Sequence, residues 1–173
     1  MKVAIYTLGC KVNQYETQAM RRLLEAEGFE TGEFVPGDEA ALSADGLVIN
    51  SCTVTGESDR KLRQLLRRCR RDNPHAVLAL TGCMPQAFPE EAEGFAEADI
   101  VLGNASRRAL PRHLAAFFQS DLGQRLCKAQ QVERELAFSC RLPAQALGFA
   151  GSQASVLLQG SIDCCFLEPD GWV

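Results

Sequence analysis

Cys10, Cys52 and Cys83 each follow directly on a short, mostly apolar segment of the chain. Thiolate ligands favour an iron–sulfur cluster or zinc, because soft sulfur selects these metals. Three ligands leave a fourth coordination position open, as a reactive site requires. Gly9 and Gly82 each stand just before a cysteine, where a glycine permits close approach of the backbone to a cluster. The ligands are far apart in sequence, so this interpretation depends on the fold that positions them.

The first 120 residues alternate between strand and helix patterns. Short apolar runs predict five strands, at residues 2–8, 29–34, 46–50, 76–80 and 99–102. Helical patterns lie between them, from Asn13 to a stop at Gly28, over 57–71, near Pro85 or Pro89, and over 107–118. This alternation predicts an α/β fold, a doubly wound, flavodoxin-like five-stranded parallel sheet in the order 2-1-3-4-5 with helices on both faces.

In that strand order, the three strands that precede Cys10, Cys52 and Cys83 are consecutive neighbours and end at the same edge. Strands lie ~4.8 Å apart, so the outer two are separated by ~10 Å before the loops lean inward. Ligands of such folds bind at this edge, outside the carboxyl ends of the strands. The alternative is that each cysteine is a small buried residue at a strand end. The pattern favours the metal site.

Composition is that of a soluble globular protein, with 173 residues, 46% hydrophobic residues and a net charge of −4. This charge gives no overall attraction to nucleic acid. No run approaches ~18 apolar residues, and the N-terminus is too short and polar for a signal peptide, so we expect a cytoplasmic protein without a membrane segment. In that reducing compartment the eight cysteines are better explained as ligands or buried residues than as disulfides.

Three motifs, in order, are similar to those of one enzyme family: TLGCKVNQYET at 7–17, NSCTVT at 50–55 and TGCMPQ at 81–86. Over residues 1 to about 119 the chain resembles the N-terminal domain of the methylthiotransferase family of radical S-adenosylmethionine enzymes. The residues after Cys10 resemble the branch that acts on N6-threonylcarbamoyladenosine at position 37 of transfer RNA. The resemblance implies transfer of a methylthio group to C2 of that nucleoside.

The resemblance also implies roles for matched residues. Cys10, Cys52 and Cys83 would ligate an auxiliary [4Fe–4S] cluster whose open iron holds the sulfur to be transferred. Asn13 and Gln14 would lie beside it, where a helix N-terminus offers amide donors to an anion. Full-length relatives continue into a barrel that binds S-adenosylmethionine and a second [4Fe–4S] cluster through Cys-x-x-x-Cys-x-x-Cys, and end in a small β-domain that contacts tRNA.

Neither later domain is expected here, because no such cysteine triplet follows Cys83 and the remaining residues are too few for a barrel. We therefore expect a 1–120 domain that is not catalytically competent alone, and self-association through the surface that the barrel would cover. Residues 121–173 are poorly patterned, with a helix predicted over 124–138 and a strand over 154–158. The chain there is interpreted as disordered or as a shifted reading frame.

Two other interpretations of the first domain stay open. One is a stand-alone module that stores a cluster or zinc without catalysis, and the other is a flavodoxin-like interaction domain whose cysteines are only packed. The helix over 57–71 carries seven positive charges, which would suit tRNA phosphate, but the pattern favours a solvated outer face. Cys69 lies within this helix and is expected to pack in the core.

Overall fold

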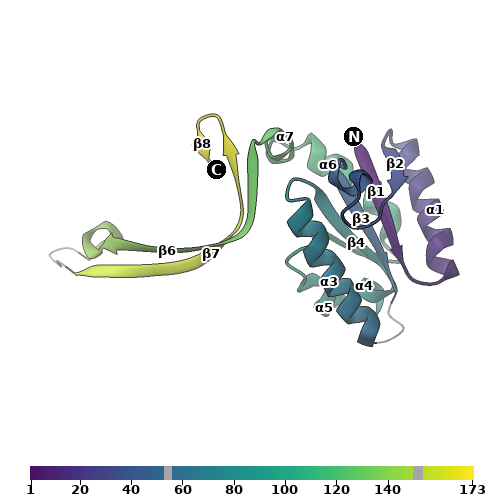
Figure 1. Cartoon of the computed structure of the whole chain (residues 1–173), viewed down its shortest axis with the longest axis horizontal. Coiled ribbons are helices and arrows are strands. Elements are labelled where there is room, and N and C mark those ends of the chain that lie inside the picture. The colour runs from purple at the N-terminus through teal and green to yellow at the C-terminus, as the bar shows by residue number, and fades with distance from the viewer. Residues whose placement is uncertain (53–55, 150–153) are drawn as a thin grey trace. The chain divides into compact units, whose positions relative to one another are not determined.

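The computed structural model describes residues 1–52, 56–149 and 154–173. The chain divides into two compact units, Met1–Cys127 and Lys128–Val173 (Figure 1). Within the described ranges, no helix is both long enough and apolar enough to cross a membrane.

The first unit is built on a five-stranded sheet in the order β2-β1-β3-β4-β5. Every neighbouring pair is parallel. The strands are β1 Lys2–Leu8, β2 Glu30–Glu33, β3 Gly46–Ser51, β4 Val77–Gly82 and β5 Ile100–Gly103. The predicted fold class and strand order are therefore confirmed.

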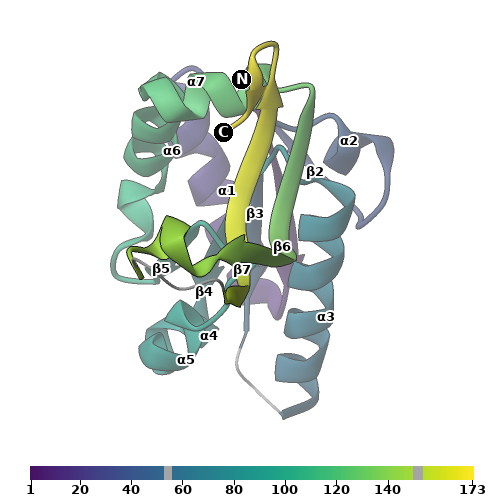
Figure 2. The same ribbon diagram turned by 90° about the vertical axis from the view of Figure 1, so that its left-hand side faces the viewer.

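Helices connect these strands and cover both faces of the sheet (Figure 2). Gly28 has a φ of +86°, a conformation open to glycine, and it ends the first helix where the sequence predicted. The Asp38 carboxylate accepts a hydrogen bond of 2.8 Å from the Ala41 amide and caps α2. The helices are α1 Lys11–Ala26, α2 Glu39–Leu42, α3 Gly56–Asp72, α4 Cys83–Ala87, α5 Pro89–Glu93, the short 3-10 helix η1 Arg107–Ala109, α6 Leu110–Gln119 and α7 Asp121–Lys128.

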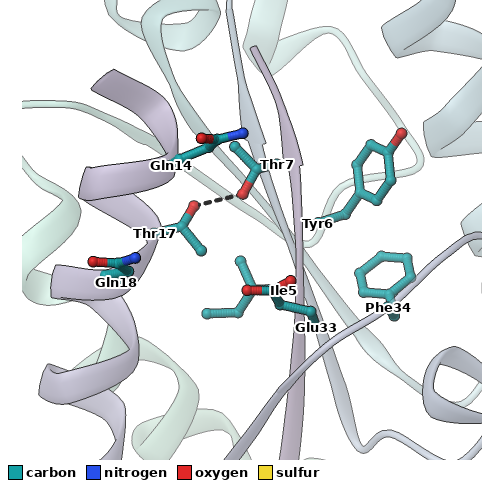
Figure 3. A pocket seen from close by; sticks show the side chains of 8 residues that line it. All are labelled: Ile5, Tyr6, Thr7, Gln14, Thr17, Gln18, Glu33 and Phe34. Atoms are coloured by element: carbon teal, nitrogen blue, oxygen red, sulfur yellow. Dashed lines mark hydrogen bonds between the residues drawn. The ribbon is translucent and has the colours of Figure 1, made fainter. Parts of the chain in front are cut away.

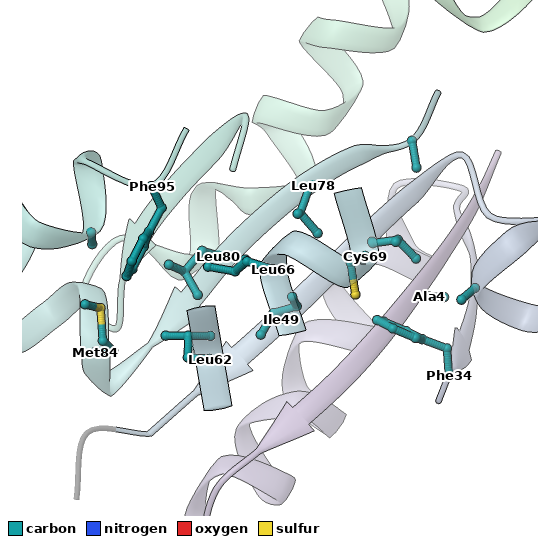
Figure 4. Packing of buried hydrophobic residues seen from close by; sticks show 14 residues of the cluster. Ala4, Phe34, Ile49, Leu62, Leu66, Cys69, Leu78, Leu80, Met84 and Phe95 are labelled. Carbon is teal, nitrogen blue, oxygen red and sulfur yellow. The ribbon is translucent and has the colours of Figure 1, made fainter. Parts of the chain in front are cut away.

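Two apolar layers lie on opposite faces of the sheet, because side chains alternate along each strand. From β3, Leu47 and Ile49 belong to the layer that contains α3, while Val48 belongs to the layer with α1 and α6. Cys69 is 2% exposed within the α3 layer (Figure 4), so its predicted packing role is confirmed. Burial, with a smaller contribution from Asp72, raises the pKa of the Cys69 thiol to about 11.

Several charges on α3 are engaged within the fold. The Arg70 guanidinium is buried, and it donates to the carbonyl oxygens of Ala76 and Glu97 and forms an ion pair with Asp99. Arg67 forms an ion pair of 3.2 Å with Glu97 at the surface. These two arginines are therefore engaged within the fold, and the solvated outer face expected for the rest of the helix stays a prediction.

The second unit is an antiparallel sheet in the order β6-β7-β8. Its elements are β6 Gln131–Pro143, the 3-10 helix η2 Ala144–Leu147, β7 Ser155–Glu168 and β8 Gly171–Trp172. The helix expected over 124–138 is wrong, because α7 ends at Lys128 and β6 begins at Gln131. Leu136, Phe138, Cys140 and Leu142 occupy alternate positions, which suits a strand paired with β7. The strand expected over 154–158 forms the start of the longer β7, and the shifted-frame interpretation stays a prediction.

Candidate metal centre

The carboxyl ends of four strands form one row across the sheet. Leu8 pairs with Ser51, Ser51 with Gly82, and Gly82 with Gly103. Each predicted ligand comes one or two residues after its strand in this row. At ~4.8 Å per strand, β1 and β4 lie ~10 Å apart. The tertiary structure therefore brings the loops that carry the three cysteines to one edge, and metal binding by them stays a prediction.

Cys10 occupies the N-terminal cap of α1. Its thiol lies beside the free amide groups of the first helical turn, and it donates a hydrogen bond of 3.2 Å to the Asn13 side-chain oxygen. The backbone N–H groups of Asn13 and Val12 lower the pKa of the Cys10 thiol, because they stabilise the thiolate. An exposed thiol with a lowered pKa is suited to bind a metal.

Two asparagines link the Cys10 and Cys52 loops. The Asn13 amide donates to the side-chain oxygen of Asn50 at 3.3 Å and to the carbonyl oxygen of Ser51 at 3.2 Å. The Asn50 amide donates in turn to the Asn13 carbonyl oxygen at 2.9 Å and to Thr17 at 3.1 Å. Both asparagines are 1% exposed. Their buried hydrogen bonds hold the start of α1 against the end of β3.

Both glycines that precede a cysteine are required for packing of the loops. Gly82 has a φ of +109°, and a Cβ atom there would overlap the backbone of Ser51. A Cβ atom on Gly9 would lie 2.9 Å from the Cβ of Cys52, closer than side-chain atoms approach. These glycines thus permit close approach between neighbouring strand ends, and the predicted approach of the backbone to a cluster stays a prediction.

Asn104 is a site residue that sequence reasoning missed. Its amide donates a hydrogen bond of 3.6 Å to the sulfur of Cys83. The loop that carries it is held by Gln86 of α4, whose side-chain oxygen accepts from the Ala105 amide at 3.0 Å. Asn104 directly follows β5, so a search for polar residues at strand ends, wider than the search for cysteines, would have found Asn104.

An ion pair between Glu16 of α1 and Arg107 of η1 also went unpredicted. The Glu16 side chain is 12% exposed, so this pair is largely removed from water. It joins α1 to the segment that follows β5, across the end of the sheet where the cysteine loops lie. Two charged residues 91 positions apart carry no signal of pairing in a single sequence.

The three thiols differ in their surroundings, since Cys10 is exposed, Cys83 is half-buried and Cys52 is buried. Among residues that the structure describes, no three His, Cys, Asp or Glu side chains are arranged to hold a metal ion. Residues 53–55 of the second motif lie outside the described ranges. The other cysteines belong to other elements, α3 (Cys69), α7 (Cys127), β6 (Cys140) and β7 (Cys164 and Cys165).

Comparison with known proteins matches residues 2–103 to a family described as Uncharacterized protein family UPF0004. The chain is 44% identical over 108 residues to threonylcarbamoyladenosine tRNA methylthiotransferase MtaB of Bacillus subtilis, covering 62% of this chain and 23% of that protein. It is 37% identical over 119 residues to the Aquifex aeolicus protein of the same name, covering 69% and 28%. Both alignments thus span only about a quarter of these relatives.

A different kind of protein matches a shorter stretch. The chain is 41% identical over 80 residues to an ATP-dependent helicase/nuclease protein of Geobacillus kaustophilus, covering 44% of this chain and 6% of that protein. Such a small share of a large protein carries no argument about the site at the carboxyl edge of the sheet.

Proposed function

This chain belongs to the Uncharacterized protein family UPF0004, and from that premise we propose that it provides the iron–sulfur domain of a tRNA methylthiotransferase. The reaction is transfer of a methylthio group to C2 of N6-threonylcarbamoyladenosine at position 37 of tRNA. The names of the Bacillus and Aquifex relatives support this substrate. The chain spans about a quarter of those relatives, so the proposal assigns only the auxiliary cluster to these residues, and S-adenosylmethionine binding, the second [4Fe–4S] cluster and radical formation belong to the remainder of such an enzyme.

The donor set fits the proposed cofactor. Cys10, Cys52 and Cys83 supply three thiols from adjacent strand ends, and thiolates are the ligands that iron–sulfur clusters take. When bound, a [4Fe–4S] cluster with three protein ligands supplies an iron with an open position for a sulfur species. The lowered pKa of Cys10 favours the ligating thiolate. Asn104 donates to the Cys83 sulfur, and hydrogen bonds to ligand sulfurs tune the reduction potential of a cluster.

One observation carries this proposal, the pairing of Leu8 with Ser51 and of Ser51 with Gly82. Residues that end paired strands leave the sheet at the same level, so the cysteines that follow them share one edge. Cysteines placed in the strands for packing alone would have no reason to fall just past this row on three adjacent strands.

The test is anaerobic reconstitution of the full chain with iron and sulfide, followed by iron counting and absorption spectroscopy. We expect about four irons per chain in the wild type. The triple variant Cys10→Ala/Cys52→Ala/Cys83→Ala is expected to lose them. A matched triple variant, Cys127→Ala/Cys140→Ala/Cys164→Ala, removes the same number of thiols and is expected to retain the iron.

Equal iron loss in the two triple variants would contradict the proposal, because it would show binding without a defined site. No iron in the wild type would favour a flavodoxin-like domain with packed cysteines. Iron binding without methylthio transfer, after addition of a separately produced radical domain and tRNA, would favour a module that stores a cluster.

A further inference from the structure

A pocket of about 350 Å³ lies beside α1, between the ends of β1 and β2. This volume is within the range of ~300–1,000 Å³ common to small-ligand sites. Figure 3 shows the side chains of Gln14 and Thr17 directed from α1 toward β1, with Gln18 further along the same helix and the rings of Tyr6 and Phe34 on the opposite side of that strand. Eight residues line the pocket: Ile5, Tyr6, Thr7, Gln14, Thr17, Gln18, Glu33 and Phe34.

The pocket contains an open strand edge. The β1–β2 ladder ends at Ile5 and Glu33, and the Phe34 amide then donates to the Ile5 carbonyl oxygen at 3.4 Å. Backbone groups along a strand alternate between its two edges, so the N–H and C=O of Thr7 face the same side as those of Ile5. The pairing with β2 stops at Ile5, so no β2 residue pairs with the backbone donor and acceptor that Thr7 presents along this edge.

The side chains around this edge suit a neutral planar ligand. Gln14 and Gln18 each present an amide with a donor and an acceptor, the arrangement that pairs with an adenine edge. Glu33 adds a carboxylate that accepts from amino groups of bases and repels phosphate. The Thr7 and Thr17 hydroxyls bond to each other at 2.7 Å, and buried Ile5 and Phe34 supply apolar surface.

A shallower depression adjoins the pocket on the same helix. It measures about 270 Å³ and is lined by Gln18, Arg21, Arg22 and Glu25. Gln18 lines both hollows. Arg21 also forms an ion pair of 3.6 Å with Glu33 at the pocket rim, while Arg22 is exposed. The exposed Arg22 guanidinium, next to a base-sized pocket, is placed to contact the phosphate of the same nucleotide.

The pocket is also close to the cysteine edge. Gln14 lies one helical turn after Cys10, and its backbone N–H donates to the Cys10 carbonyl oxygen at 3.2 Å. With a rise of ~1.5 Å per residue, Gln18 is ~12 Å and Arg22 ~18 Å along α1 from Cys10. A nucleic-acid strand that follows α1 would meet the cysteine edge, then the pocket, then the arginines.

We propose that this pocket binds an unpaired base of the RNA, next to the nucleotide presented at the cysteine edge. The inference rests on the proposed function and deepens it by giving the chain its own RNA-reading site. Sequence-specific proteins read RNA mainly through unstacked, unpaired bases bonded along their edges. A peptide that extended the sheet is disfavoured, because the open edge of β1 covers only Tyr6 to Leu8.

The test titrates the iron-free, ¹⁵N-labelled full chain with a synthetic anticodon stem–loop RNA. We expect the side-chain amide signals of Gln14 and Gln18 to shift. Gln18→Leu removes both the donor and the acceptor from an exposed position, so it is expected to weaken binding about tenfold without loss of fold. The matched control is Gln64→Leu, at an exposed glutamine on α3, where the affinity is expected to stay unchanged.

A fully paired RNA duplex with the same stem should leave both amide signals in place. Arg22→Ala is expected to reduce the salt dependence of binding by about one phosphate contact. Equal affinities for Gln18→Leu and Gln64→Leu, or equal shifts with the duplex, would overturn the inference. The RNA titration needs no iron, so the two proposals can fail separately. Loss of RNA binding with normal iron reconstitution would contradict only the base pocket. Failed iron reconstitution with normal RNA binding would contradict only the cluster.

Discussion

The side-chain amide of Asn13 donates a hydrogen bond of 3.2 Å to the backbone carbonyl oxygen of Ser51. Asn13 is in the first turn of α1, three residues after Cys10, and Ser51 directly precedes Cys52. One buried side chain thus sets the separation of two predicted ligands that are 42 positions apart in the sequence. The contacts around these strand ends predict how substitutions there change the free energy of unfolding and how the alkylation of thiols depends on pH.

Replacing Asn13 with Ala should destabilise the first unit. The change leaves the side-chain oxygen of Asn50 and the carbonyl oxygen of Ser51 without a buried donor. Such a loss costs ~2 kcal/mol in the free energy of unfolding, whereas Gln64→Ala on the surface should change it by less than ~0.5 kcal/mol. Urea denaturation followed by circular dichroism measures both values. Equal stabilities of the two variants would show that the asparagine pair contributes nothing.

Gly82→Ala and Gly28→Ala should separate backbone strain from steric overlap. Both glycines have positive φ, but a Cβ on Gly28 meets nothing within 4 Å, while one on Gly82 overlaps Ser51. The left-handed conformation costs an alanine ~1 kcal/mol, so Gly28→Ala should lose about that amount of unfolding free energy. Gly82→Ala should lose at least ~3 kcal/mol, because strand ends must also move apart. Thermal unfolding of the two proteins provides the comparison, and similar losses would rule out the close contact.

Alkylation of thiols should depend on pH differently at Cys10 and Cys127. Helix amides lower the pKa of Cys10, whereas burial, followed by the charge of Asp45, raises that of Cys127. The thiolate is the reactive form, so Cys10 should reach half its maximal rate at a lower pH than an ordinary thiol and Cys127 at a higher pH. Iodoacetamide labelling of the iron-free chain across a pH series, read by mass spectrometry of peptides, measures both midpoints. The opposite order would contradict the placement of Cys10 at the helix N-terminus.

Much of the first unit could be predicted because its signals are local. Short apolar runs alternate with amphipathic segments, and this pattern allows few topologies once crossovers are right-handed. The strand order and the shared edge for Cys10, Cys52 and Cys83 follow from it. The prediction failed around Phe138, where a two-residue period in a polar context was mistaken for part of a helix. Its pairing with Gly160 of β7 identifies it as a strand.

The sequence by itself determined which segments form the strands and where they end to within two residues, and thus which thiols can share one edge of the sheet. Only the tertiary structure decided which side chains meet there. The bonds from Asn13 to Asn50 and from Asn104 to Cys83 join residues 37 and 21 positions apart. The pocket beside Thr7 exists because β2 stops pairing after Glu33. Periodicity reports the face on which a residue lies, whereas such contacts depend on the strand register and the length of each pairing, which are set when all elements pack together.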